Sequence, residues 1–232
     1  MIRLAPLALV LAAAPVAAEE RTFSVGSFER VRVDGPFRVE IATGGSPGAK
    51  ARGDRQLLER LVVEVNGATL TVRLGSGGWG ETPGRRVTAP PVLTLTAPRL
   101  NALTVTAGAQ VAVSRMAGQR VDLSVTGAGA VTVARAEADQ LNASLAGTGT
   151  ITVSGRTNRA RLVTNGPGTI DAGALNAKDL IVRQDGAGET RANAAYSAQV
   201  TTTGLGRVTV AGNAKCTVKA AAGGPVSCGP KL

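Results

Sequence analysis

Residues 127–188 read GAGAVTVARAEADQLNASLAGTGTITVSGRTNRARLVTNGPGTIDAGALNAKDLIVRQDGAG and contain four glycine turns at a nearly constant spacing. The repeat continues on both sides of this stretch, and adjacent turns lie 18 to 20 residues apart. A fixed period of this size is typical of a solenoid, because each repeat can bury its apolar face only by stacking on its neighbours. The turns are Gly127-Ala128-Gly129, Gly147-Thr148-Gly149, Gly166-Pro167-Gly168, Gly186-Ala187-Gly188 and Gly204-Leu205-Gly206, with weaker copies at Ala107-Gly108-Ala109 and Ala222-Gly223-Gly224.

Apolar residues occupy fixed places relative to each turn. Counted from the first turn residue, the places four before, four after and six after it are almost all apolar. Because alternate side chains of a strand point to the same face, we expect inward ladders from coils stacked about 4.8 Å apart. The three columns are Leu103, Leu123, Ala143, Leu162, Val182, Val200 and Val218; Val111, Val131, Ile151, Ile170, Thr190, Val208 and Val226; and Val113, Val133, Val153, Ala172, Ala192, Val210 and Cys228.

The places between these apolar ones are polar, which supports the same assignment of inward and outward positions. Opposite charges fall on neighbouring coils, as in Asp171 and Arg191, and such cross-strand pairs contribute about 0.2–1 kcal/mol each. Other outward columns are rich in hydroxyl groups, and these residues are Thr104, Ser124, Ser144, Thr106 and Thr126. The sequence therefore predicts an all-β fold, a single-stranded parallel β-helix with coils of about 18–20 residues.

The same repeat pattern also fits residues 28–42, which we expect to form a first coil with Gly35 at the turn position. We expect one domain over residues 19–232, in which an irregular insert over 43–91 separates that coil from regular coils over 92–228.

The insert has its own local signals. Asp54 is expected to cap a short helix over Arg55–Leu61, because its carboxylate can accept the free N–H groups of the first turn. Asn66-Gly67 suits a two-residue turn between strands at 61–65 and 70–74. The glycine-rich stretch 75–86, which holds Trp79, predicts a loop.

Several runs of this sequence combine into a recognisable pattern. They are Phe28-Glu29-Arg30-Val31-Arg32-Val33, Gly35-Pro36-Phe37-Arg38-Val39-Glu40-Ile41, Leu57-Leu58, Val63-Glu64-Val65-Asn66-Gly67-Ala68-Thr69-Leu70 and the repeated glycine turns. Together they resemble one bacterial family, the DUF2807 family of exported proteins, known as the auto-transporter adhesin head or GIN domain. The resemblance covers roughly Phe28 to Gly212. It implies a right-handed β-helix-like fold and brings no established catalytic residues.

Residues 1–18 have the features of a secretory signal peptide. Arg3 supplies a positive start, residues 4–16 form an apolar stretch, and Val16-Ala17-Ala18 is a small-residue cleavage site. No Cys follows the apolar stretch to carry a lipid anchor, and no later segment has the roughly 20 apolar residues of a spanning helix. We therefore expect a periplasmic or secreted protein with no transmembrane segment.

The net charge of +10 has two interpretations. A basic surface can simply keep an exported protein in solution, or it can attract polyanions such as lipopolysaccharide and anionic glycans. Nucleic acid is not expected as a partner, because three Phe, one Tyr and one Trp provide no set of stacking platforms.

Cys216 and Cys228 lie six places before and six places after the last turn. Both places belong to inward columns, and an even pair of cysteines in an exported chain favours a disulfide. We predict a bond that closes the final coil. The alternative is two small buried thiols.

Catalysis has little support in the sequence. There is no His, which removes the commonest general base and metal ligand, and no cofactor or metal site is expected. The one candidate set of catalytic carboxylates is Asp171, Asp185 and Glu189. Arg183 and Arg191 lie close to them in the sequence, so a solvated salt-bridge ladder also explains these acids.

Three functional hypotheses follow. The first is a non-enzymatic, adhesin-like binding or scaffolding protein of the cell envelope, with a glycan, lipopolysaccharide or protein as partner. The second is a carbohydrate-active enzyme that uses the three acids above. The third is a purely structural envelope protein. An exposed end coil could also pair edge to edge with a second chain, which leaves both a monomer and a dimer open.

Overall fold

The computed structural model describes residues 19–75, 90–221 and 223–229. The predicted signal peptide and nearly all of the predicted loop at 75–86 lie outside these residues. The protein is a β-solenoid of about 6 turns, with 71% of its residues in strands and 3% in helix. Within the described part of the chain, no helix is both long and apolar enough to cross a membrane.

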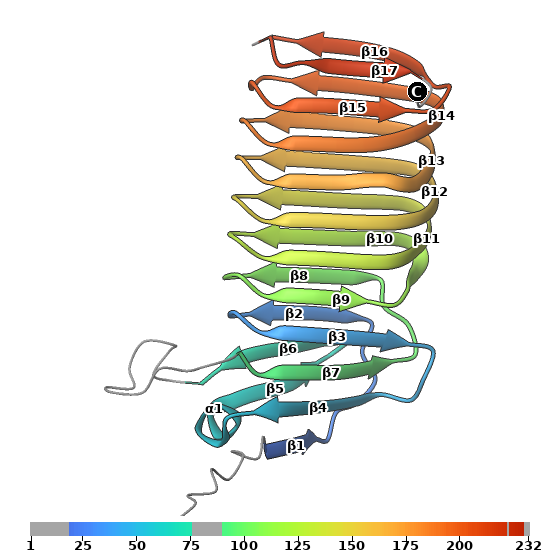
Figure 1. Cartoon of the computed structure of the whole chain (residues 1–232). Coiled ribbons are helices and arrows are strands. Elements are labelled where there is room, and N and C mark those ends of the chain that lie inside the picture. The colour runs from blue at the N-terminus through green and yellow to red at the C-terminus, as the bar shows by residue number, and fades with distance from the viewer. Residues whose placement is uncertain (1–18, 76–89, 222, 230–232) are drawn as a thin grey trace, which may run out of the picture.

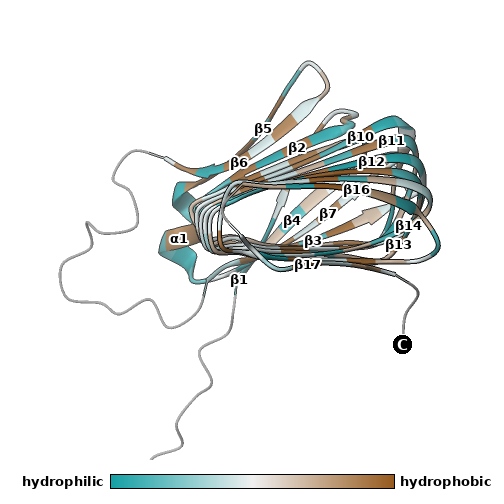
Figure 2. Ribbon diagram, turned by 90° about the horizontal axis from the view of Figure 1, so that it is seen from above, coloured by the Kyte–Doolittle hydropathy of each residue, from teal (hydrophilic) through white to brown (hydrophobic). Residues whose placement is uncertain are grey.

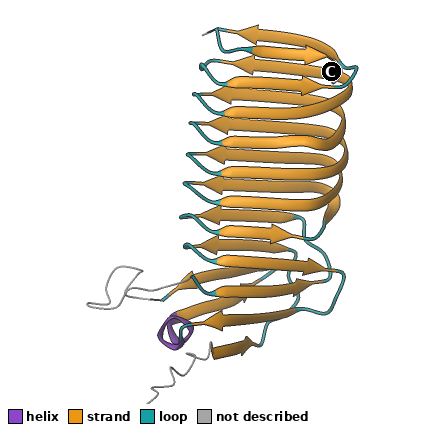
Figure 3. Ribbon diagram, in the orientation of Figure 1, coloured by secondary structure: helices purple, strands orange, loops and turns teal. Residues whose placement is uncertain are grey.

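In the described part of the chain, strands follow one another with one short helix among them (Figure 3). In chain order they are β1 (Glu19–Phe23), β2 (Arg30–Asp34), β3 (Arg38–Thr43), β4 (Gly48–Gly53), α1 (Arg55–Arg60), β5 (Leu61–Asn66), β6 (Thr69–Leu74), β7 (Val92–Ala97), β8 (Ala102–Thr106), β9 (Gln110–Val113), β10 (Met116–Thr126), β11 (Ala130–Ala146), β12 (Thr150–Asn165), β13 (Thr169–Asp185), β14 (Glu189–Thr202), β15 (Arg207–Ala211), β16 (Lys215–Ala220) and β17 (Val226–Gly229).

Two stacks of parallel strands form the solenoid and meet at the glycine turns (Figure 1). The first face holds β2, β6, β8, β16 and the later parts of β10 to β14. The second face holds β3, β7, β9, β15, β17 and the earlier parts of β11 to β14. On the side opposite the turns, the long strands β11 to β14 continue around a rounded corner from the second face to the first. Viewed along the stack, the two faces enclose one core (Figure 2).

The predicted columns are the ladders of this core. Leu123 pairs with Leu103 on one side and with Ala143 on the other, and Ile151 pairs with Val131 and Ile170. Side chains at these places are at most 3% exposed from β8 to β15. The alternation of apolar and polar places therefore identified the inward face correctly in the coils from β8 to β15.

The lowest coils are not stacked in chain order. The coil that contains β2 and β3 lies between the coil of β8 and β9 and a coil built from β6 and β7. The insert thus supplies β6 to the parallel stack itself, rather than only looping out between coils. Beyond this coil the pairing becomes antiparallel, because β5 pairs with β6, and β4 pairs with both β7 and β1.

The predicted helix and hairpin of the insert both form, but the helix ends one residue early, at Arg60, and the hairpin turn is shifted by one residue. Asp54 caps α1 and accepts a hydrogen bond of 2.9 Å from the Gln56 amide, while Leu57 and Leu58 are buried. The hairpin of β5 and β6 forms, but its two turn residues are Gly67 and Ala68 rather than Asn66 and Gly67. Gly67 has a φ of 58°, which suits the first position of a II′ turn, where glycine is preferred.

Glycine is required at the two positions of a turn for different physical reasons. In four of the five Gly-X-Gly turns the first glycine adopts a positive φ, as at Gly147 (117°), a conformation that costs glycine little. Gly204, the first glycine of the fifth turn, does not, and it lies against the backbone of Gly186 instead. The second glycine lies directly against the turn of the preceding coil, so that a Cβ on Gly188 would be 2.2 Å from the carbonyl oxygen of Gly168. Backbone hydrogen bonds join successive turns, such as the Gly149 amide to the Gly127 oxygen at 2.9 Å. The turns are therefore stacked as closely as the strands.

One inward column changes character along the stack. Two places before the turn, Val125 and Leu145 give way to Thr164, Gln184 and Thr202, all at most 1% exposed. The Thr190 hydroxyl donates to Gln184 Oε1 at 2.6 Å and lies 2.9 Å from the Thr164 hydroxyl. Gln184 Nε2 is buried and has no hydrogen-bond partner among the described residues. The upper coils therefore hold a small polar cluster inside the core.

Candidate functional site

A surface hollow of about 910 Å³ runs along the rounded corner and crosses the coils of β10 to β14. We call it the corner groove. Its floor is a column of small residues, Gly118, Ala138, Thr157 and Ala177, which pair with one another from coil to coil. Because none of these side chains is large, the corner is hollowed between the longer side chains on either side.

One flank of the corner groove is formed by Glu137, Arg156 and Asn176. Arg156 forms an ion pair with Glu137 at 3.2 Å, and Arg115 approaches the same carboxylate from the coil below. The hydrogen bond from Arg115 is the main cause that lowers the pKa of Glu137 below its ordinary value. The carboxylate is therefore ionised at neutral pH and held between two guanidinium groups.

The opposite flank presents one outward side chain per coil: Gln119, Asp139, Asn158, Lys178 and Tyr196. Asn158 donates a hydrogen bond of 2.9 Å to Asp139, which joins neighbouring coils. Tyr196 is 67% exposed and is one of the three exposed large hydrophobic residues in the described part of the chain. An aromatic ring thus lies at the upper end of a groove that has polar side chains on both flanks.

A second hollow of about 340 Å³ continues the corner groove downward, and the two share Gly118. Its lining includes Arg99, Arg115 and the end of β3 at Thr43. Arg99 is exposed and makes no ion pair with any residue that the structure describes. The lower end of the groove is therefore positively charged.

The three acids considered as catalytic candidates are not arranged as a free carboxylate pair. Arg191 contacts both Glu189, at 3.0 Å, and Asp171, at 4.0 Å. Asp185 lies before the turn, on the first face, where Thr203 donates a hydrogen bond to it. In the described residues, no group of three Cys, Asp or Glu side chains could hold a metal ion. Asp171 and Glu189 therefore share Arg191 in a salt-bridge cluster, whereas Asp185 makes no ion pair within the described residues.

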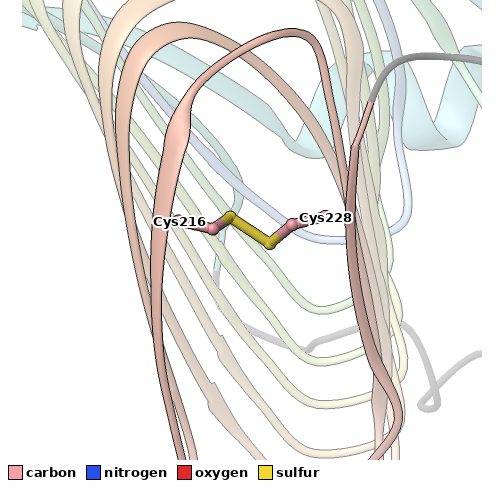
Figure 4. The surroundings of a disulfide bond; sticks show 2 residues. All are labelled: Cys216 and Cys228. Carbon is pink, nitrogen blue, oxygen red and sulfur yellow. A yellow bond between two sulfur atoms is a disulfide. The ribbon is translucent and has the colours of Figure 1, made fainter.

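The predicted disulfide between Cys216 and Cys228 is confirmed (Figure 4). The bond spans the interior of the last coil from β16 to β17, with a Cα–Cα distance of 6.5 Å. The partners of these cysteines in the preceding coil, Ala198 and Val210, are buried. The cysteines themselves are partly or fully exposed, because no described coil stacks on the last one. Val218, in the same coil, is 44% exposed for the same reason.

The hydroxyl-bearing columns of the first face lie outward as expected. Ser124 pairs with Thr104 below and Ser144 above, and Thr126 pairs with Thr106. This face is a flat sheet surface, whereas the corner is hollowed.

Sequence reasoning did not single out the corner groove, although its signal is present in the same frame. Nine places before each turn stand the small residues of the floor, and eight places before it stand the outward residues that end with Tyr196. A column of small residues next to a column of long polar ones would have indicated a groove.

Comparison with known proteins identifies relatives of the whole fold. A family model described as "Putative auto-transporter adhesin, head GIN domain" (DUF2807) matches residues 27–214. No curated protein is detectably similar to this sequence.

Among solved structures, the chain is similar to a "putative adhesin" from Bacteroides fragilis, with 19% identity over 94% of this chain and 98% of that one (TM-score 0.81). It is also similar to a "putative lipid binding protein" from Parabacteroides distasonis, with 20% identity over 93% and 98% of the two chains (TM-score 0.71). A "putative adhesin" from Parabacteroides merdae shares 16% identity over 94% and 97% (TM-score 0.67). At these identities the likeness is one of fold.

Proposed function

Because the chain belongs to the DUF2807 family of adhesin head domains, we propose that it is an exported, non-enzymatic binding protein of the cell envelope that contacts its ligand through the corner groove. The observation that carries the proposal is the groove itself. It is a continuous hollow of about 910 Å³ with polar flanks and an exposed aromatic ring at Tyr196. Concave sites with a few well-placed polar groups are typical of ligand-binding surfaces.

Two further features support this proposal. The Cys216–Cys228 disulfide is consistent with an oxidising compartment outside the cytoplasm. The acids that could have served an enzyme are engaged by Arg191 or by Thr203, so binding explains the surface better than catalysis. The charged and amide side chains on both flanks of the groove can bind a partner with many hydroxyl groups, such as an envelope glycan.

The test uses the chain from residue 19 onward, immobilised and exposed to separated envelope fractions: glycan, lipopolysaccharide and protein. We expect retention of one fraction that Tyr196→Ala abolishes. Leu205→Ala is the matched control, because Leu205 is 73% exposed but lies in a glycine turn on the other side of the solenoid.

Equal retention by the Tyr196 variant would refute the groove as the contact site. Retention that disappears at moderate salt for every variant alike would indicate attraction by net charge alone.

A further inference from the structure

We propose that the corner groove binds a linear, acidic oligosaccharide that lies parallel to the solenoid axis. In this arrangement one sugar ring stacks on Tyr196, and an acidic substituent at the other end meets Arg99 and Arg115. This inference rests on the proposed function and specifies the chemical class of the ligand.

The shape of the groove sets the shape of the ligand. From the coil of Gly118 to the coil of Tyr196 the groove crosses four coil steps, which at about 4.8 Å per step amount to about 19 Å. The groove runs along the stack and continues into the lower hollow at Gly118. An extended chain with a short repeat fits such a channel, and each repeat meets equivalent positions on successive coils.

The flanks of the groove offer both donors and acceptors, as sugar hydroxyl groups require. Asn158 uses its Nδ2 to bond Asp139, which leaves its Oδ1 as an acceptor toward the groove. Asn176 accepts from Asn193 at 2.8 Å through Oδ1, which leaves its Nδ2 as a donor. The partners of these amides fix their orientation in advance, so little side-chain freedom is lost on binding.

Tyr196 supplies the apolar contact that such a ligand needs. Its ring is 67% exposed at the upper end of the groove, beside the small side chain of Ala195. The face of an aromatic ring carries a partial negative charge, which attracts the polarised C–H groups of a sugar ring. A single platform of this kind suits one stacked sugar, whereas a nucleic-acid strand needs several.

The lower end of the groove indicates the acidic group. Arg99 is exposed and makes no ion pair within the described residues, and Arg115 lines the same hollow. Glu137, the partner of Arg115, is also held by Arg156. Planar guanidinium groups bind carboxylates and phosphates through paired hydrogen bonds. The two arginines can therefore receive a negative charge without leaving Glu137 unpaired.

The experiment measures binding of the chain from residue 19 onward by calorimetry to linear uronate oligosaccharides of increasing length, namely oligomannuronate, oligogalacturonate and hyaluronan fragments. Each probe is paired with its carboxyl-reduced, neutral counterpart. We expect at least one series to bind, with affinity that rises up to about four sugar units, one for each coil step, and falls about tenfold or more on carboxyl reduction.

Substitutions test which residue contacts each end of the bound oligosaccharide. Tyr196→Ala should weaken binding of the acidic and the neutral chain about tenfold, whereas Arg99→Gln should weaken only the acidic chain. Leu205→Ala should leave both unchanged, and thermal unfolding of each variant checks that the fold is intact.

Failure of all three series to bind, equal affinity for acidic and neutral chains, or an Arg99 variant without effect would overturn the inference. If envelope material still binds in a Tyr196-dependent manner in that case, the proposed function stands and only the ligand class is wrong. If Tyr196→Ala affects neither measurement, both fail.

Discussion

Reduction of the Cys216–Cys228 bond should release the last coil and leave the rest of the solenoid folded. The bond joins residues 12 apart, so it closes a loop of about 13 residues. The chain-entropy relation gives about 9.7 cal/mol/K for such a loop, or about 2.9 kcal/mol at 25 °C. That free energy corresponds to about a hundredfold change in the equilibrium for opening the coil.

The position of the bond makes this effect local. Among the residues that the structure describes, the last coil pairs with one neighbouring coil, through β14 and β15, and Val218 is already 44% exposed. In a repeat protein, stability is close to a sum of terms between nearest neighbours, so a weakened end coil opens without its distant neighbours.

Hydrogen exchange followed by mass spectrometry measures this directly. Comparison of the oxidised and reduced protein should show up to a hundredfold faster amide exchange over residues 215–229 and unchanged exchange over 123–185. A variant with both cysteines changed to Ala, which should exchange like the reduced protein, controls for effects of the reductant. Equal acceleration in every coil, or protection at 215–229 that survives reduction, would refute the reasoning.

Two further predictions concern the interior. Gly188→Ala places a Cβ 2.2 Å from the Gly168 oxygen and should lower the free energy of unfolding, measured by urea titration, by about 1–3 kcal/mol. Gly48→Ala is the control: it has nothing within 4 Å of its Cβ and should change the free energy of unfolding by less than about 0.5 kcal/mol. Equal effects of the two substitutions would contradict the account of the stacked turns. Replacing the buried polar cluster with apolar residues of similar size should raise the free energy of unfolding by about 1–3 kcal/mol, because it removes the buried Gln184 Nε2 that has no hydrogen-bond partner. A free energy of unfolding below that of the unchanged protein would show that the cluster is net stabilising. The substitutions are Thr164→Val, Gln184→Met and Thr190→Val.

The regular coils were predictable from sequence because their rules are local and repeated. Period-two alternation assigns each side chain to the inside or the outside, and the glycine turns set the register between coils. The same frame placed both cysteines in inward columns of one coil, which is why the disulfide could be predicted from their positions. Each of these inferences depends on residues close in sequence or one coil away.

The order of the coils at the lower end of the stack could not be predicted from the sequence pattern. Nothing in the pattern of β6 and β7 states which side of the first coil they occupy, since a parallel strand can pair on either edge. The structure places them beneath β2 and β3, which leaves the upper edge of that coil free for β8 and β9. The hairpin turn moved by one residue because Gly67, with its positive φ, takes the first turn position.

The corner groove and the polar cluster were predictable from the sequence only in part. Their residues occupy regular columns, yet a column of small side chains becomes a groove only when the chain bends there and the flanking side chains lie on either side of it. Gln184 likewise stands at an inward place that its amide does not suit, and only the packed core shows that its Nε2 has no partner.

The sequence alone therefore determined the β-solenoid, its core columns and its disulfide, because alternation and repeat length act between neighbours. Tertiary structure decided the order of the lowest coils, which depends on where distant segments pair, and it made a groove of the small-residue column, because the chain bends there.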